Sequence, residues 1–330
     1  MQKTTGLGPK PAQPGDLHGR VAIITGGARG IGFEISRALA NAGCKVIMVN
    51  RNQDKGDHAI RIIKKESPDA EVEWRGCDMG YLAQVREVFG GLRENLPRLD
   101  FLVCSAGINA DQFGLDQDGI DRHFGVNYLG HYYACNQMWP LLRKTGRENG
   151  NTAPPRVVFE ASEMHRMAPS AVHFGSSEEI NNPEMDPAQL YGRTKLALIL
   201  LAKYGLRDKV IKPNSDRIYA LSVHPGTVKT DMQEQWKSAY PGVTGKVLSR
   251  TMQAFGRAPK EGAYSALWAL TSPKIEEKNL NGWYFKDPDS PGKESSQASD
   301  AVLGAALWNL SDRLVKEKLG EDVMLDWNAQ

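Results

Sequence analysis

The sequence contains little that would anchor the chain in a membrane or attract a polyanion. Its 330 residues include 41 Lys and Arg against 39 Asp and Glu, so a net charge of +2 provides no extended basic surface. No apolar run approaches the roughly 18–20 residues that span a bilayer. We therefore expect a globular protein that has neither a nucleic-acid partner nor a membrane span.

Cysteine and metal-binding patterns are also scarce. None of the four cysteines forms a CxxC pair, and most lie in apolar stretches, which predicts reduced and buried thiols. The seven histidines form no HxxxH pair and no His/Cys cluster with metal spacing, so we predict no metal. Residues 1–17 lack the hydrophobic block of a signal peptide, and together with the cysteines this predicts a cytoplasmic protein.

The sequence does contain a regular alternation of strands and helices. Short β-branched or apolar runs predict strands at 21–25, 45–50, 71–74, 101–104, 156–159, 218–223 and 283–285. Helical spacing of apolar residues predicts helices at 31–42, 55–66, 82–96, 121–144, 187–204, 262–271 and 301–318. This alternation indicates an α/β fold, a single doubly wound Rossmann-type domain with a mostly parallel sheet flanked by helices.

The expected domain covers residues 18–330 and follows a flexible lead-in at 1–17 that is rich in Gly and Pro. Two long segments of mixed composition, at about 163–186 and 231–260, interrupt the alternation. Both follow the carboxyl ends of predicted strands, where ligands bind in open α/β sheets. We expect these insertions to form the substrate side of a binding site.

A glycine-rich turn, Thr25-Gly-Gly-Ala-Arg-Gly-Ile-Gly32, joins the first predicted strand to the first helix. Glycines allow the backbone to approach a pyrophosphate that rests on a helix N-terminus. The spacing Gly-x3-Gly-x-Gly differs from the common Gly-x-Gly-x2-Gly fingerprint, and a tight turn that binds nothing is the plainer alternative. Its position in the first strand–helix unit favours a dinucleotide site that includes Gly26, Gly30, Ile31 and Gly32.

The second predicted strand ends at Asn50-Arg51, where a NAD site of this kind usually places Asp or Glu. An acidic side chain would repel a 2′-phosphate, whereas the guanidinium groups of Arg29 and Arg51 would bind it through charge-assisted hydrogen bonds. The sequence therefore favours NADP(H) over NAD(H). The alternative is that both arginines are solvated surface charges.

Tyr191 and Lys195 are four residues apart in a predicted helix and so share one face. An ammonium beside a phenol favours the phenolate, so we expect Lys195 to lower the pKa of Tyr191 toward neutrality and make it a general acid or base. Ser162 ends a strand, where its hydroxyl can bind a substrate oxygen, and Asn127 is a poor helix former inside a predicted helix. A surface Tyr–Lys pair, a turn serine and a structural asparagine are the corresponding alternatives.

In combination, these motifs resemble the short-chain dehydrogenase/reductase family. The matching residues occur in family order across residues 20–230: Gly26, Gly30, Gly32, Asp78, Ala106, Gly107, Asn127, Ser162, Tyr191, Lys195 and the segment Pro225–Thr230. The NYLGH and HPGTVKT stretches and the terminal LWNLSDRL helix look most like the branch of retinol dehydrogenases and WW-domain oxidoreductases.

The resemblance implies a role for each matching residue. Tyr191 would transfer the proton, Lys195 would bind the nicotinamide ribose, Ser162 would polarise the substrate oxygen, and Asn127 would hold a relay water. The implied cofactor contacts also include Asp78 and Met79 near the adenine, Ser105, Ala106 and Gly107 beneath the adenosine, and Pro225, Gly226, Val228 and Thr230 at the nicotinamide end. The sequence departs from the family at Cys104-Ser105, which replaces Asn-Asn, and at the acidic Glu160.

The leading hypothesis is an NADP(H)-dependent oxidoreductase that reduces a ketone or aldehyde, or oxidises the alcohol, of a bulky and mostly apolar small molecule. A polyketide, terpenoid, steroid or retinoid would fit, and such a substrate is typical of secondary metabolism. Met164, His165, Met232 and Trp236 are candidate substrate contacts. Two alternatives stay open, a non-catalytic NADP(H)-binding sensor or scaffold and a reductase-fold dehydratase or isomerase without net redox change. A homo-oligomer also stays open.

Overall fold

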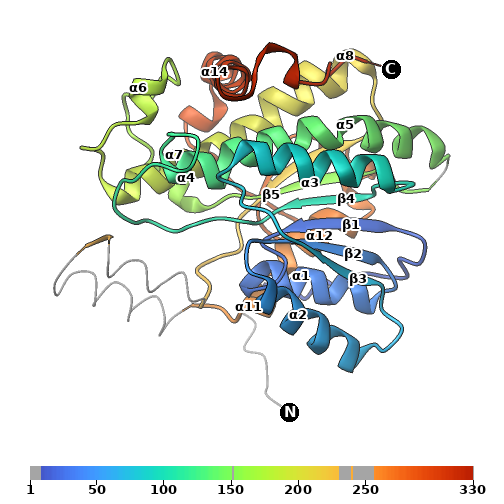
Figure 1. Cartoon of the computed structure of the whole chain (residues 1–330). Helices are drawn as coiled ribbons and strands as arrows, with labels where there is room; N and C mark the ends of the chain where they lie inside the picture. The colour runs from blue at the N-terminus through green and yellow to red at the C-terminus, as the bar shows by residue number, and fades with distance from the viewer. Residues whose placement is uncertain (1–8, 151, 230–238, 241–255, 330) are drawn as a thin grey trace.

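Eight strands form one sheet in the order β3-β2-β1-β4-β5-β6-β7-β8, seen in a computed structural model that describes residues 9–150, 152–229, 239–240 and 256–329 (Figure 1). The strands are β1 (Val21–Thr25), β2 (Lys45–Val49), β3 (Val72–Arg75), β4 (Phe101–Cys104), β5 (Arg156–Glu160), β6 (Tyr219–Val223), β7 (Tyr284–Asp287) and β8 (Ser290–Pro291). All neighbouring pairs are parallel except β7 with β8. The predicted doubly wound fold is confirmed, and its order reverses between β1 and β4, where ligands bind in such sheets.

Helices cover both faces of the sheet (Figure 1). One face carries α3 (Leu82–Asn95), α5 (Gly130–Glu148), α7 (Pro187–Leu200) and α14 (Ala301–Leu319), and the other carries α1 (Gly30–Asn41), α2 (Gln53–Glu66), α11 (Pro259–Gly262) and α12 (Tyr264–Thr271). Alternate residues of each strand enter the two cores, so Val157 and Phe159 of β5 pack on the first face and Val158 packs on the second. The near-continuous apolar strands follow from this two-sided burial.

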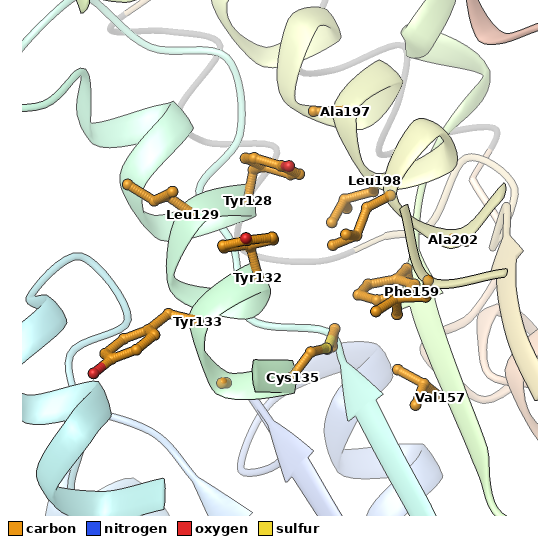
Figure 2. Close-up of a cluster of buried hydrophobic side chains, with 14 of the residues drawn as sticks. Tyr128, Leu129, Tyr132, Tyr133, Cys135, Val157, Phe159, Ala197, Leu198 and Ala202 are labelled. Carbon is orange, nitrogen blue, oxygen red and sulfur yellow. The ribbon is translucent and has the colours of Figure 1, made fainter. Parts of the chain in front are cut away.

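The core between β5, α5 and α7 is aromatic (Figure 2). Tyr128 and Tyr132 present their rings toward Leu198 of α7, and Phe159 lies beside them on the sheet. All four side chains are almost completely buried. The two helices are therefore held at a fixed distance, and α7 is firmly placed at the carboxyl edge of β5.

The helix predicted to end at Tyr204 is longer than expected. Helical structure continues from α7 through the π-helical segment η3 (Leu201–Ile211) and α8 (Lys212–Asn214), and it ends at Ser215, whose φ is 52°. The prediction was wrong here because Leu206 and Val210 extend the buried stripe against α14, although the sequence around them is polar. A second π-helical turn, η1 (Gly125–Leu129), joins the short α4 (Arg122–Phe124) to α5.

The insertion at 163–186 folds as the 3-10 helix η2 (Glu163–Met167), a connecting loop and α6 (Ser177–Ile180). The buried guanidinium of Arg193 on α7 donates to the carbonyl oxygens of Glu179 at 2.9 Å and Ile180 at 2.8 Å, and to Asp121 Oδ2 at 3.1 Å. These bonds fix the insertion against α7. Most of the second insertion lies outside the described residues.

The carboxyl-terminal segment covers α5. After α13 (Lys274–Glu277), η5 (Gln297–Ser299) and α14, the chain turns through η6 (Glu321–Val323), and the Trp327 ring packs 5.6 Å from Trp139 and 5.0 Å from Trp308. All four cysteines are buried and unbridged, as predicted. None of the helices in the described part of the chain is long and apolar enough to cross a membrane. The domain boundary near residue 18 stays a prediction.

Candidate active site

Tyr191 and Lys195 lie on successive turns of α7, as their spacing predicts. The helix begins with Pro187 at its first turn and with Asp186 as N-cap, whose carboxylate accepts from the Ala188 amide at 2.9 Å. Lys195 Nζ lies 5.3 Å from the centroid of the Tyr191 ring. It also donates to the main-chain oxygen of Glu160 at 2.6 Å, so the end of β5 fixes the ammonium beside the phenol.

Ser162 lies two residues beyond β5 and faces Tyr191. Its hydroxyl oxygen caps η2 by accepting from the Met164 amide at 3.1 Å, and it lies close enough to the phenol of Tyr191 to lower the pKa of that group. The capping role and the catalytic position therefore coexist in one side chain. The structure brings Ser162, Tyr191 and Lys195 together at the carboxyl edge of β5.

The charge state of Tyr191 differs from the expectation. Burial raises the pKa of the Tyr191 phenol well above its usual value of 10.0, the Glu160 carboxyl raises it further, and only the neighbouring Ser162 hydroxyl lowers it. The predicted fall toward neutrality is therefore corrected, because desolvation disfavours the charged phenolate and the Glu160 carboxyl disfavours it further. The Tyr191 phenol therefore holds its proton at neutral pH.

Asn127 lies in the π-helical turn η1 and ties two parts of the site together. Its amide oxygen accepts from the Ile108 amide at 2.8 Å, and its Nδ2 donates to Ile108 O at 2.9 Å and to Thr194 Oγ1 at 3.1 Å. The side chain thus joins the loop after β4 to α7, next to Tyr191. The relay of protons through Asn127 stays a prediction.

The glycine turn is held tightly against the loop that follows β4. Gly26 has a φ of 67°, and a Cβ there would lie 2.9 Å from Ala106 Cα. A Cβ on Gly32 would lie 2.5 Å from Gly26 O. The amides of Ser105 and Ala106 donate to Thr25 Oγ1 at 2.9 and 3.0 Å. Backbone therefore meets backbone at the N-terminus of α1, which leaves no room for a side chain at Gly26 or Gly32.

The end of β2 holds the groups expected to select the cofactor. Arg51 is exposed, and its Nη1 lies 3.4 Å from Asp78 Oδ2. Asn50 Nδ2 donates to Asn52 O at 2.9 Å, while its buried Oδ1 has no hydrogen-bond partner within the described residues. Arg29 is exposed at the N-cap of α1. Met79, next to Asp78, is buried.

The segment after β6 forms the opposite wall. Val228 pairs with Arg257 in a short parallel bridge, and Arg257 Nη1 donates to Pro225 O at 3.4 Å on the other side of Gly226. Gly262 of α11 separates Val228 from Ile31 of α1, so this wall reaches the glycine turn. The predicted contacts Thr230, Met232 and Trp236 lie outside the described residues.

The two described substrate candidates have different surroundings. Met164 packs with Tyr191 and Tyr240 in a small apolar cluster that also contains Ala110, Ala188 and Ala239. His165 is fully buried, with Nδ1 at 2.7 Å from Ser162 O and Nε2 accepting from the Ser295 amide at 3.1 Å. Because both ring nitrogens are engaged, His165 braces the Ser162 segment, and this placement argues against the predicted substrate contact.

Comparisons with known proteins agree with this geometry. The family model described as short chain dehydrogenase matches residues 20–168. The chain is 32% identical to the short chain dehydrogenase/reductase dpchH of Colletotrichum higginsianum, covering 91% of this chain and 76% of the relative. The chain belongs to the short-chain dehydrogenase/reductase family. This confirms the resemblance and identifies an oxidoreductase family.

Other relatives match nearly the same share of this chain. The WW domain-containing oxidoreductase of Gallus gallus is 30% identical and covers 92% of this chain and 70% of its own. The polyprenol dehydrogenase of Danio rerio is 30% identical and covers 91% and 88%. A crystal structure of an uncharacterized protein from Mycobacterium paratuberculosis, 25% identical, covers 92% and 96% with a TM-score of 0.67.

Members of the short-chain dehydrogenase/reductase family bind nicotinamide cofactors, and the residues present fit such a cofactor. The glycine turn is a cradle in which a Cβ on Gly26 or Gly32 would collide with backbone. The unpartnered Asn50 Oδ1 stands at the end of β2, where a ribose hydroxyl can donate to it. Within the described residues there is no group of three His, Cys, Asp or Glu side chains placed to hold a metal.

The motifs did not point to several groups that build this site. The ring of His131 joins two parts of the site, since its Nδ1 lies 2.9 Å from the Asn127 carbonyl oxygen and its Nε2 lies 2.9 Å from Thr25 Oγ1. Burial lowers the pKa of His131 to about 4, so the imidazole is neutral. Arg193 sits between Tyr191 and Lys195 in sequence yet points the opposite way, into a buried bond with Asp121. The clue available in the sequence was that Arg193 is a second charged residue, besides Lys195, in a helix whose other residues are mostly apolar.

Proposed function

We propose that this protein reduces the carbonyl group of a bulky, mostly apolar small molecule with NADPH, or oxidises the corresponding alcohol with NADP⁺. The observation that carries the proposal is the placement of the Tyr191 phenol between the Ser162 hydroxyl and the Lys195 ammonium. Because Tyr191 stays protonated at neutral pH, the site is prepared to protonate a carbonyl oxygen as it accepts a hydride.

Each group has a chemical task in this proposal. When bound, the nicotinamide supplies or accepts the hydride. Ser162 donates a hydrogen bond to the substrate oxygen and fixes it beside the phenol, and Tyr191 transfers its proton to that oxygen. Lys195, held by Glu160 O, stabilises the phenolate that remains. Asn127 keeps α7 in register with the loop after β4.

Preference for NADP(H) rests on the charge at the adenosine end. Arg29 and Arg51 are both exposed near the glycine turn and the end of β2. The residue at the end of β2 is the neutral Asn50, so no carboxylate at that position opposes a 2′-phosphate. The two arginines are proposed to bind that phosphate.

An apolar substrate is supported by the cluster beside Tyr191. Met164, Tyr240 and the alanines packed with them place hydrocarbon around the phenol on the substrate side. One relative is named for the oxidation of a polyprenol, a long hydrocarbon alcohol. We propose a hydrophobic ketone, aldehyde or alcohol of that general character, with a cytoplasmic site of action and a role in secondary metabolism.

The test is consumption of NADPH, followed by its near-ultraviolet absorbance, against a panel of bulky hydrophobic ketones and aldehydes. Tyr191→Phe should reduce turnover by about 10²–10⁴-fold, since the general acid is lost. NADPH fluorescence titration should show that this variant still binds cofactor, and NADH serves as the comparison cofactor. Turnover that survives in Tyr191→Phe would contradict the assignment.

A further inference from the structure

Glu160 is a buried carboxyl group that the mechanism above uses only through its backbone. It is the last residue of β5, and its side chain is 5% exposed. Neither carboxylate oxygen has a hydrogen-bond partner within the described residues. Burying an unpaired carboxylate is costly, so a buried carboxyl without partners is expected to have a function that justifies it.

Its surroundings place this carboxyl in the catalytic site. The strand alternation sends Phe159 and Ala161 into the core shared with α5 and α7, so the side chain of Glu160 leaves the opposite face of the sheet at its carboxyl edge. The ammonium of Lys195 bonds the main-chain oxygen of the same residue at 2.6 Å. Both Lys195 and Tyr191 respond to the charge of this carboxyl.

The neighbouring strands bring no competing charge. Val223 of β6 is in register with Glu160, and the next residue, His224, accepts from the Glu163 amide at 3.3 Å. Burial lowers the pKa of His224 to about 4, so its ring is neutral. On β4, Cys104 is in register with Phe159 and is followed by the neutral Ser105. Among the described residues, Lys195 and Tyr191 are the ionisable groups of the site that interact with the Glu160 carboxyl.

We propose that the carboxyl group of Glu160 is a third ionisable group of the catalytic site, a positioning residue whose negative charge opposes loss of the proton from Tyr191. An ionised Glu160 stabilises the Lys195 ammonium and destabilises a phenolate at Tyr191. The carboxylate thus offsets part of the effect of Lys195 on the phenol. Its consequence is that Tyr191 remains a proton donor for carbonyl reduction to higher pH than it would beside Lys195 alone.

The sign of the pH effect on stability follows from the burial of Glu160. Desolvation raises the pKa of this carboxyl above its ordinary 4.5, and the charge of Lys195 only partly opposes the shift. Since the folded state prefers the protonated form, the stability that this group contributes is fully present below the unfolded pKa. It is lost as the pH rises through the folded pKa.

The first test measures thermal unfolding of the wild type and of Glu160→Gln, an isosteric neutral variant, from about pH 5 to about pH 9. The variant should gain stability relative to the wild type as the pH rises through this window. The matched control is Glu163→Gln. Although burial opposes it, hydrogen bonds from Arg166 and Tyr284 lower the pKa of Glu163, so its stabilising effect is lost only in acid and its difference from wild type should be flat in this window. A flat difference for Glu160→Gln as well would overturn the proposal.

The second test rests on the proposed function and compares pH–rate profiles of carbonyl reduction. Loss of the carboxylate should move the alkaline limit of reduction by Glu160→Gln to lower pH by about one unit, with the profile of Glu163→Gln unchanged. An unchanged alkaline limit in Glu160→Gln would contradict the catalytic part of the proposal. The unfolding experiment needs neither cofactor nor substrate, so failure to find a substrate leaves it decisive.

A third variant tests whether the Glu160 carboxyl is needed for folding. Glu160→Val suits a strand of β-branched residues and removes the buried polar group altogether. It should be more stable than the wild type, most of all near pH 9, because no carboxylate has to be desolvated. A Glu160→Val variant that unfolds at lower temperature than the wild type at every pH would show that the carboxyl is structural.

Discussion

The two sides of the active site are built by different forces. On the side of the glycine turn, the backbone at Gly26 lies close to the loop after β4, and the backbone at Gly32 lies close to Gly26. Both close approaches are possible because these residues have no side chain. At β5 and α7, charged side chains are buried among apolar ones, with Arg193 on Asp121 and Lys195 on the carbonyl of Glu160. The first side depends on steric fit over a few residues. The second depends on electrostatic partners that are distant in sequence.

The largest expected effect comes from removing a buried charge on the side of the site formed by β5 and α7. Arg193→Met removes a fully buried guanidinium and leaves the Asp121 carboxylate buried without its cation. We expect a loss of about 3–5 kcal/mol in the free energy of unfolding, measured by chemical denaturation. Tyr191 lies on the same helix, so turnover should fall together with stability.

The matched control for this substitution is Arg313→Met. Arg313 also donates to a carbonyl of the insertion, Gly175 O at 2.8 Å, but its side chain is exposed on α14. An exposed contact of this kind contributes about 0–1 kcal/mol. Equal losses in the two variants would show that burial of the Arg193–Asp121 pair does not distinguish the two sides of the site.

This contrast also explains what the sequence predicts well. The strand–helix alternation, the glycine turn and the Tyr191–Lys195 spacing depend on local periodicity and on residues close together in the chain, and the structure places them as expected. The charge state of Tyr191 was predicted wrongly because it is set by desolvation and by Glu160, 31 positions earlier in the sequence. The π-helical extension beyond Tyr204 was missed because packing against α14 decides it.

A smaller effect is expected on the steric side. Gly32→Ala would place a Cβ 2.5 Å from Gly26 O, and because that atom is backbone, the start of α1 must shift. We expect a loss of about 1–3 kcal/mol in unfolding free energy, together with weaker NADPH binding in a fluorescence titration.

The same substitution elsewhere gives the opposite sign. Gly91 lies in α3, and a Cβ there meets nothing within 4 Å. Gly91→Ala should stabilise the protein by about 0.5–1 kcal/mol through helix propensity, with NADPH affinity unchanged. If Gly32→Ala behaved like Gly91→Ala, the close backbone approach at the glycine turn would not be required.

The smallest effect on stability is expected at Arg51, a charged residue on the side of the site that contains the glycine turn. Arg51 is 66% exposed and lies 3.4 Å from Asp78, so its removal should cost little stability. If Arg51 binds the 2′-phosphate, Arg51→Ala should weaken NADPH binding by about tenfold, and by less at high salt, while NADH affinity stays the same.

The control is Arg61→Ala, which removes the same charge from the exposed surface of α2. A drop common to NADPH and NADH would mean that Arg51 shapes the pocket rather than recognising the phosphate, and an equal drop in Arg61→Ala would reduce its role to net charge. Selective loss of NADPH in Arg51→Ala alone would show that an exposed charge can decide the cofactor even where backbone geometry decides the fold.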